Sequence, residues 1–283
     1  MMIKVGEPVF LSNLLVYPLL GEDKGNGYCT LDEVQNRIIV EELPKARVEA
    51  ILVENRADRP LLMIDGEEVI GALQNRIVAT SAILEPMTRT EILTTCVEQN
   101  RWQGSRSFKT GETCSFPSIR AIIARASVKG ESPQGKVWEH IDKKLKSTRT
   151  ISKTSSMHDI YENLDSHLDR YVAGIEDLEA NGMIGVCGDL IIGLDYFRSR
   201  ELFKRFKVKL IRSYGLEAID RNLRTGAIEV KPFIQKVFNS KKRWRKVRGG
   251  GQGQVEARMG RDYVARRLRY RHSLIHLSAF SID

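Results

Sequence analysis

The chain has 283 residues, of which 42% are hydrophobic and 29% are charged. This balance is typical of a globular protein with one large domain or two modest ones. No apolar run approaches the roughly 20 residues of a membrane-spanning helix, and the N-terminus lacks the pattern of a signal peptide. We therefore expect a cytoplasmic protein that has no membrane partner.

Positive charge gathers near the C-terminus. The formal net charge is +9, but residues 231–271 contain fourteen Lys or Arg and two acidic residues, a net of 14 − 2 = +12. The rest of the chain therefore sums to 9 − 12 = −3. Basicity is thus a local feature, and it needs a local explanation such as an anionic partner.

The four cysteines, Cys29, Cys96, Cys114 and Cys187, lie far apart. Their spacing fits no zinc site, and a chain of this length needs no disulfide, so we expect reduced thiols and no metal. No phosphate-binding glycine loop or nucleophile motif occurs, because GGGQGQ follows a basic run instead of a strand. The sequence therefore identifies no cofactor.

The first half of the chain has the pattern of an antiparallel sheet. Residues 8–20 predict an entry strand, and Thr30 with Glu33 three positions later predicts the start of a short helix. Between residues 48 and 98, turn residues recur every eight to twelve positions, which is typical of a sandwich or barrel-like sheet. The expected strands of this meander are residues 48–55, 61–64, 69–78, 81–86 and 90–98.

Residues 103–116 form a polar connection that we expect to be a loop, and the chain then turns helical. Apolar residues at three- and four-residue spacing predict amphipathic helices, the first of them opened by Pro117. The expected helices are residues 117–128, about 134–145, 156–179, about 199–222 and 232–238. A hairpin is expected over residues 183–197, and the last apolar residues should return to a sheet.

Together these patterns predict an α+β fold. Its N-terminal half, residues 1–113, is a β-rich antiparallel domain of the sandwich or barrel-like kind. Residues 114–283 form a helical middle followed by a mixed α+β C-terminal part that carries the basic segment. The two parts can also form one compact unit.

Polar residues gather at both ends of the expected meander. Asp65, Glu67 and Glu68 surround a glycine, and their carboxylates could bind a metal or the hydroxyls of a sugar. A solvated turn explains them equally well. Gln74 and Arg76 face the same side of a strand, so that an amide and a forked guanidinium could meet one phosphate or carboxylate. The alternative is an exposed strand face on which Arg76 pairs with a nearby Glu.

The next expected strand ends in a similar group. Cys96 and Glu98 share a strand face, and Arg101 and Trp102 follow the strand end. Cys96 has no histidine nearby in sequence to act as a base, which favours a buried structural thiol. Glu98 could act as a general base or accept a ligand hydrogen bond, and Trp102 could stack on a ligand, although a simple strand end remains the alternative.

The basic segment offers a second kind of site. Six of the eight residues from 241 to 248 are Lys or Arg, and the aromatic residues Trp244, Tyr263 and Tyr270 lie within or after this run. This pattern would suit nucleic acid, by phosphate neutralisation and base stacking, an acidic protein partner, or the electropositive wall of a pocket for a phosphate-bearing ligand. A solvated surface without a binding role is the remaining alternative. The residues concerned are Lys241, Lys242, Arg243, Trp244, Arg245, Lys246 and Arg248.

Several motifs occur in a recognisable order: GEEVIGALQNRIV, CVEQNRW, IGVCGDLIIGLDYF, KLIRSYGLEAI and IHLSAF. Over about residues 5–280 this order resembles the ARPP domain family, named for association with ADP-ribosylglycohydrolases and rhodanese-phosphatases. The resemblance implies no known activity, but the association suggests a nucleotide-derived or phosphorylated metabolite. The positions that match the family motifs are Gly66, Glu67, Gln74, Asn75, Arg76, Cys96, Glu98, Arg101 and Trp102.

From the resemblance, our leading hypothesis is a protein that binds, and could process, a phosphorylated nucleotide-derived molecule such as an ADP-ribose-like metabolite. The roles would be Arg76 and Arg101 on the phosphates, Gln74 and Asn75 for orientation, Trp102 for stacking, and Glu67 and Glu98 at the ribose or as acid and base. The alternatives are a nucleic-acid-binding module that acts through the basic segment and an assembly protein. We also expect a homo-oligomer, and whether the protein is an enzyme stays open.

Overall fold

The computed structural model describes residues 3–25, 27–175, 178–221 and 228–282. Within these residues, seventeen strands and six α-helices build a β-rich α+β fold. The named strands pair antiparallel throughout, in one nine-stranded, one six-stranded and one two-stranded sheet. The expected fold class is therefore confirmed.

The nine-stranded sheet joins both ends of the chain. Its strands run in the order β1-β3-β12-β13-β17-β16-β15-β14, with β2 paired to β3. The last apolar segment, as expected, lies in the middle of this sheet. The strands are β1 (Lys4–Val5), β2 (Val9–Leu11), β3 (Leu14–Leu20), β12 (Gly182–Cys187), β13 (Leu190–Phe197), β14 (Arg245–Lys246), β15 (Gln254–Met259), β16 (Tyr263–Tyr270) and β17 (Ser273–Ser281).

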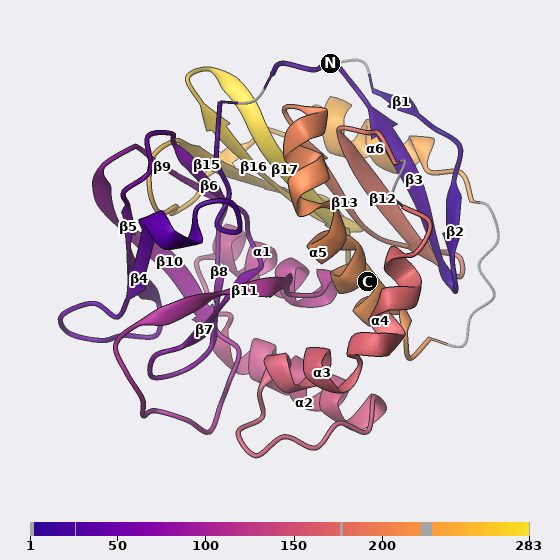
Figure 1. Cartoon of the computed structure of the whole chain (residues 1–283). Coiled ribbons are helices and arrows are strands. Elements are labelled where there is room, and N and C mark those ends of the chain that lie inside the picture. The colour runs from indigo at the N-terminus through magenta and orange to yellow at the C-terminus, as the bar shows by residue number, and fades with distance from the viewer. Residues whose placement is uncertain (1–2, 26, 176–177, 222–227, 283) are drawn as a thin grey trace.

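The meander of the first half forms the two smaller sheets. The six-stranded sheet has the order β11-β7-β8-β10-β5-β4, and β6 pairs with β9. Figure 1 shows these strands on one side of the molecule and the nine-stranded sheet on the other. The strands are β4 (Ile38–Glu41), β5 (Ala50–Asn55), β6 (Leu61–Met63), β7 (Glu67–Gly71), β8 (Arg76–Val78), β9 (Ala82–Leu84), β10 (Thr88–Cys96) and β11 (Phe108–Cys114).

Helices cover both faces of the nine-stranded sheet. The helices are α1 (Pro117–Lys129), α2 (Gln134–Ser147), α3 (Met157–Asn163), α4 (Asp165–Val172), α5 (Arg200–Ala218) and α6 (Lys231–Asn239). Side chains alternate along β3, so that Leu14 and Val16 join the core formed with α1 to α5, while Leu15 and Tyr17 join the core formed with α6. In Figure 1, α1 and α5 lie between the two large sheets.

Three expectations of secondary structure were wrong. The connection 103–116 contains β11, in which Lys109 and Glu112 are exposed while Phe108, Thr113 and Cys114 are buried, and a register shift hides the alternation. The expected helix 156–179 is two helices that meet at Leu164. Residues 176 and 177 of that expectation, and residue 222 of the next, lie outside the described residues.

The third wrong expectation concerns Thr30. Its backbone N–H donates to Glu33 at 2.9 Å, so the capping contact itself forms. The turn nevertheless leads only to a 3₁₀ turn over Gln35–Arg37, because strand β4 begins at the next residue.

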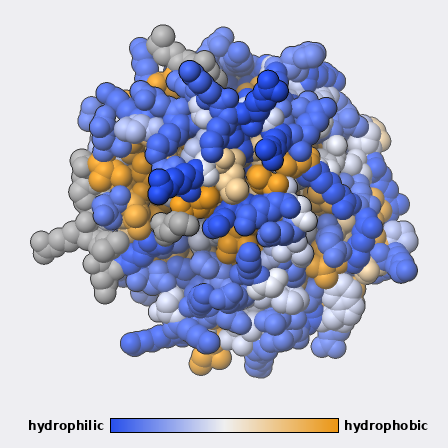
Figure 2. Space-filling view, turned by 180° about the vertical axis from the view of Figure 1, so that it is seen from behind, coloured by the Kyte–Doolittle hydropathy of each residue, from blue (hydrophilic) through white to orange (hydrophobic). Residues whose placement is uncertain are grey.

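Hydrophilic side chains cover most of the face seen in Figure 2, where apolar residues form small separate patches. Among the described residues, no helix combines the length and apolar character required to traverse a bilayer.

Candidate functional site

The two strand tips predicted to share a site do meet. Strands β8 and β10 pair with Cys96 opposite Arg76, which brings together the residues just outside each strand. The carboxylate of Glu98 accepts from Arg101 Nε and Nη2 at 2.8 and 2.7 Å, and from the backbone N–H of Asn75 at 2.9 Å. Gln74 Nε2 donates to the carbonyl of Glu98 at 2.9 Å. Four of the predicted residues therefore form one hydrogen-bonded cluster.

Glu98 is ionised in this cluster. Burial alone would raise the pKa of Glu98, but hydrogen bonds from Arg101 and from the Asn75 amide outweigh burial and lower that pKa. Arg101 also donates to the carbonyls of Ala72 at 2.7 Å, Gln103 at 3.0 Å and Gly71 at 3.1 Å, and to Asn75 Oδ1 at 3.2 Å. Acid–base catalysis by Glu98 stays a prediction, and a carboxylate held ionised suits the role of base better than that of acid.

Arg76 is already bound within the protein. Its Nη2 donates to both carboxylate oxygens of Glu42, at 2.6 and 2.8 Å, and its Nη1 donates to the carbonyls of Arg47 and Ala50 at 2.8 and 3.1 Å. The side chain is completely buried. Phosphate binding by Arg76 also stays a prediction, and it would require this guanidinium to leave Glu42.

Two of the predicted site residues, Trp102 and Glu67, do not belong to the Glu98 cluster. Trp102 is 50% exposed, and the guanidinium carbon of Arg76 lies 5.9 Å from the centroid of its ring. Glu67 is buried against α5, where Lys209 donates to it at 3.1 Å and also contacts Asp32 at 2.8 Å. These two carboxylates raise the pKa of Lys209, although burial works against them. Glu67 thus forms a buried ion pair apart from the Glu98 cluster.

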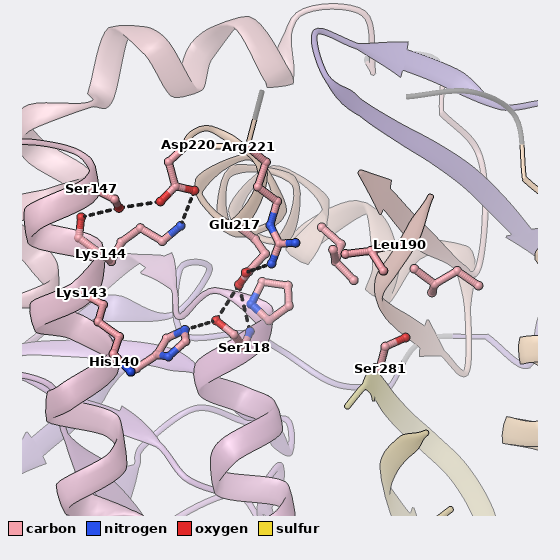
Figure 3. A pocket seen from close by; sticks show the side chains of 13 residues that line it. Ser118, His140, Lys143, Lys144, Ser147, Leu190, Glu217, Asp220, Arg221 and Ser281 are labelled. Atoms are coloured by element: carbon pink, nitrogen blue, oxygen red, sulfur yellow. Dashed lines mark hydrogen bonds and ion pairs between the residues drawn. The ribbon is translucent and has the colours of Figure 1, made fainter. Parts of the chain in front are cut away.

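A cavity of about 510 Å³ lies at another place, between α1, α2, the C-terminal end of α5 and the start of β13. Figure 3 shows polar side chains of all three helices converging on it, with Leu190 and Ser281 on the opposite wall. The polar residues that line it are Ser118, His140, Lys143, Lys144, Ser147, Glu217, Asp220, Arg221 and Ser281. We call this space the helix-lined cavity.

A chain of hydrogen bonds crosses one wall of the helix-lined cavity (Figure 3). Ser118 Oγ lies 2.7 Å from His140 Nε2 and 2.7 Å from Glu217 Oε2. The backbone N–H of Ser118 donates to the same Glu217 oxygen at 3.0 Å, so Glu217 satisfies a free amide in the first turn of α1. Burial, together with Lys144 and Lys143, lowers the pKa of His140 against the opposing effect of Glu217.

The cations of the cavity are held to different degrees. Lys144 is buried and contacts Asp220 at 2.9 Å and the carbonyl of Leu216 at 3.1 Å. Lys143, in contrast, has a side chain that is 66% exposed, and its ion partner is Glu139 on the same helix. Arg221 pairs with Glu217 at 3.1 Å. Lys143 is therefore the most exposed of these three cations.

Sequence reasoning placed His140 on a helix and gave it no role. The spacing of His140, Lys144 and Ser147 puts them on one side of α2, next to the apolar residues that face the core. That spacing was the feature of the sequence from which a shared site for His140, Lys144 and Ser147 could have been predicted. The contribution of Glu217 had no such signal, because it lies 99 residues from Ser118.

The residues of the basic segment lie on the surface. Lys241, Lys242, Arg243, Arg245, Lys246 and Arg248 are exposed, and β14 within them is an edge strand of the nine-stranded sheet. We call residues 241–248 the basic strip. Among the described residues only Arg248 of the strip has a carboxylate partner, Glu91 at 4.0 Å. Trp244 lies against the guanidinium carbons of Arg258 and Arg267, at 4.4 and 4.3 Å.

Comparison with known proteins gives one match. No curated protein and no solved structure matches the chain. The model of one family, described as the ARG and Rhodanese-Phosphatase-superfamily-associated Protein domain, matches residues 2–280. Because this match covers almost the whole chain, the protein belongs to the ARPP-1 family.

Proposed function

We propose that the protein binds a small phosphorylated, nucleotide-derived metabolite in the helix-lined cavity. One observation carries this proposal: a hydroxyl, an imidazole and an ammonium group, on Ser118, His140 and Lys143, line a single space of about 510 Å³. Sites for small molecules typically measure about 300–1,000 Å³ and combine apolar walls with a few convergent polar groups. The association expressed in the family name supports a ligand of the ADP-ribose type.

The cost of freeing a cation favours this cavity over the strand tips. Lys143 forms a pair with Glu139 in which both side chains are solvent-exposed, and such a pair contributes little to stability. Arg76 is buried with Glu42, and separating a buried pair costs about 3–5 kcal/mol. Lys143 can therefore turn toward a phosphate at little cost, whereas Arg76 cannot.

Calorimetry with ADP-ribose tests this proposal. Lys143→Ala should weaken binding about tenfold, because it removes one charge-assisted hydrogen bond of about 1.5 kcal/mol. Lys146→Ala is the matched control, since Lys146 is an exposed lysine of the same helix that does not line the cavity. Trp102→Ala should leave affinity unchanged. Loss of binding in Trp102→Ala, with none in Lys143→Ala, would place the ligand at the strand tips instead.

The basic strip favours a second function, the binding of single-stranded nucleic acid. The specific observation is that Lys241, Lys242, Arg243, Arg245 and Lys246 are exposed and have no carboxylate partner among the described residues. Such cations can neutralise phosphates without first breaking an ion pair. The ring of Trp244 is less available for stacking with bases than the sequence suggests, because the guanidiniums of Arg258 and Arg267 already lie against it.

The salt dependence of oligonucleotide binding distinguishes a specific role of the basic strip from a general effect of surface charge. For a single-stranded oligonucleotide, each phosphate contact contributes about 0.7 to the slope of log affinity against log salt concentration. The triple variant Lys241→Gln/Lys242→Gln/Arg243→Gln should therefore reduce the magnitude of this slope by about 2. The control, Lys109→Gln/Lys129→Gln/Lys136→Gln, removes equal charge from exposed lysines elsewhere. Equal effects of the two triple variants, or no binding at low salt, would reject nucleic-acid binding.

A further inference from the structure

Only one of the two ring nitrogens of His140 has a hydrogen-bond partner within the described part of the chain. Its Nε2 is 2.7 Å from Ser118 Oγ, and its Nδ1 has no hydrogen-bond partner among the described residues. The ring packs against Phe116, with centroids 5.8 Å apart, and it lines the helix-lined cavity. The orientation of the imidazole is therefore fixed from two sides.

The neighbours of His140 also fix its tautomer. Ser118 Oγ has one proton and two candidate acceptors, His140 Nε2 and the carboxylate of Glu217, both at 2.7 Å. A carboxylate is the stronger acceptor, because hydrogen bonds to an ionised group are about twice as strong as neutral ones. Ser118 therefore donates to Glu217, and His140 must donate its Nε2–H to Ser118. The proton is on Nε2, which leaves a lone pair on Nδ1.

We infer that His140 Nδ1 accepts a hydrogen bond from a hydroxyl of the ligand while Lys143 contacts its phosphate. This inference rests on the proposed function of the cavity, and it narrows the ligand to hydroxyl-bearing sugar phosphates such as the ribose phosphate part of a nucleotide. Ser118 and Glu217 are positioning residues, since they act on the ligand through His140.

Charged groups on two helices face this imidazole. Lys143, Lys144 and Glu139 come from α2, and Glu217 comes from α5 with its partner Arg221. The cations and partial burial keep the ring neutral at neutral pH, so Nδ1 remains an acceptor there. As the pH falls through the pKa of His140, Nδ1 gains a proton and this contact with a hydroxyl is lost.

Nitrogen NMR of the histidine rings tests the tautomer and the contact separately. The free protein should show His140 as the Nε2–H tautomer, and ribose 5-phosphate should shift the Nδ1 resonance while inorganic phosphate should not. An Nδ1–H tautomer would overturn the inference. So would an unmoved Nδ1 resonance while ribose 5-phosphate binds. If ADP-ribose binds but ribose 5-phosphate does not, the ligand contact fails and the proposed function stands. If none of the three binds, the proposed function itself fails, whereas the tautomer in the free protein is still determined.

Variants give an independent measure. His140→Phe keeps a ring against Phe116 and should weaken ribose 5-phosphate binding about tenfold, the effect of one hydrogen bond, while inorganic phosphate affinity stays within about twofold. Ser118→Ala should release the tautomer preference, and Ser118→Thr, which keeps the hydroxyl, should restore it. A tautomer that is identical in Ser118→Ala would show that Ser118 does not position His140.

Discussion

Arg76 donates four hydrogen bonds to its own chain, two of them to the carboxylate of Glu42, and none of its side chain is exposed. Burial lowers the pKa of this guanidinium, and the neighbouring carboxylate of Glu42 opposes that effect. The pair links β8 to the segment that follows β4, far from it in sequence. At the scale of one residue, Arg76 is therefore a stabilising group of the first half of the chain.

Removing one partner of this pair should be more damaging than removing both. Arg76→Ala leaves a buried carboxylate uncompensated and should lower the free energy of unfolding by about 3–5 kcal/mol. The double variant Arg76→Met/Glu42→Leu should lose less, because no buried charge remains. Urea denaturation of the single and double variants checks this, with Lys146→Ala, at an exposed position, as a control that stays within about 0.5 kcal/mol. Additive losses would contradict a buried pair.

Residue types and strand periodicity predicted part of the candidate site. The meeting of Asn75, Glu98 and Arg101 follows from two neighbouring strands whose ends coincide. What the sequence could not predict is which partner each charged group takes. Arg76 contacts Glu42, 34 residues away, and Ser118 contacts Glu217, 99 residues away. Such pairs depend on packing of distant elements, and local patterns do not encode that packing.

At the scale of elements, apolar periodicity predicted α1, α2, α5 and α6 within a few residues. Helices α2 and α6 each bury one side, so the spacing of their apolar residues reports that side directly, whereas α5 is buried all round from Ser213 to Ala218. The break at Leu164 was not predictable in the same way, because apolar spacing continues across it. There α3 contacts α2, whereas α4 packs on α5 through ion pairs of Arg212 with Asp165 and Asp169. Tertiary contacts thus override a continuous helical pattern.

Helix α3 is attached to the six-stranded sheet by a pair that titrates. His158 Nδ1 lies 3.0 Å from Glu68 Oε2, and this hydrogen bond raises the pKa of His158 above its usual value of 6.5. A raised pKa in the folded state means that the pair stabilises the fold fully below pH 6.5, and that this stabilisation is lost as the pH rises through the folded pKa. The attachment of α3 should therefore weaken in mildly alkaline solution.

Hydrogen exchange and denaturation at several pH values test this attachment. Between about pH 6 and pH 8.5 the free energy of unfolding should lose the contribution of this pair, and amides of α3 should exchange faster at the upper end after correction for the intrinsic rate. His158→Gln should abolish the pH dependence that belongs to the pair. A variant that retains the full pH dependence would assign it to another group.

At the scale of the whole molecule, one buried network connects the sheets. Asp65, from the turn before β7, accepts from Arg266 of β16 at 2.7 Å and from Arg120 of α1 at 3.2 Å. Arg120 also contacts Asp195 of β13 at 2.6 Å, and Asp195 contacts His276 of β17 at 3.0 Å. Burial opposes ionisation of Asp65, but the two guanidiniums hold its pKa well below the usual range. The network thus crosses the expected boundary at residue 113.

The first strands of the chain also join elements on both sides of residue 113. Strands β1 to β3 belong to the nine-stranded sheet, although residues 1–113 were expected to form a domain of their own. A chain that exchanges both strands and buried charges between its halves should unfold as one unit, because neither half can keep its core without the other. Whether residues 1–113 and 114–283 are separate domains therefore depends on whether the two parts unfold in one cooperative transition.

Asp65→Asn addresses that question directly. It leaves Arg266 buried without a carboxylate and should lower the free energy of unfolding by about 3–5 kcal/mol. Fluorescence of variants that retain only Trp102, beside Arg76 in the first half, or only Trp244, beside Arg258 of β15, reports on the two parts separately. Both transitions should shift to lower denaturant together. A charge left unpaired in a core that both halves share must destabilise both halves. If only the Trp102 transition shifted, residues 1–113 and 114–283 would therefore be independent domains, and the buried network would not be needed to hold them together.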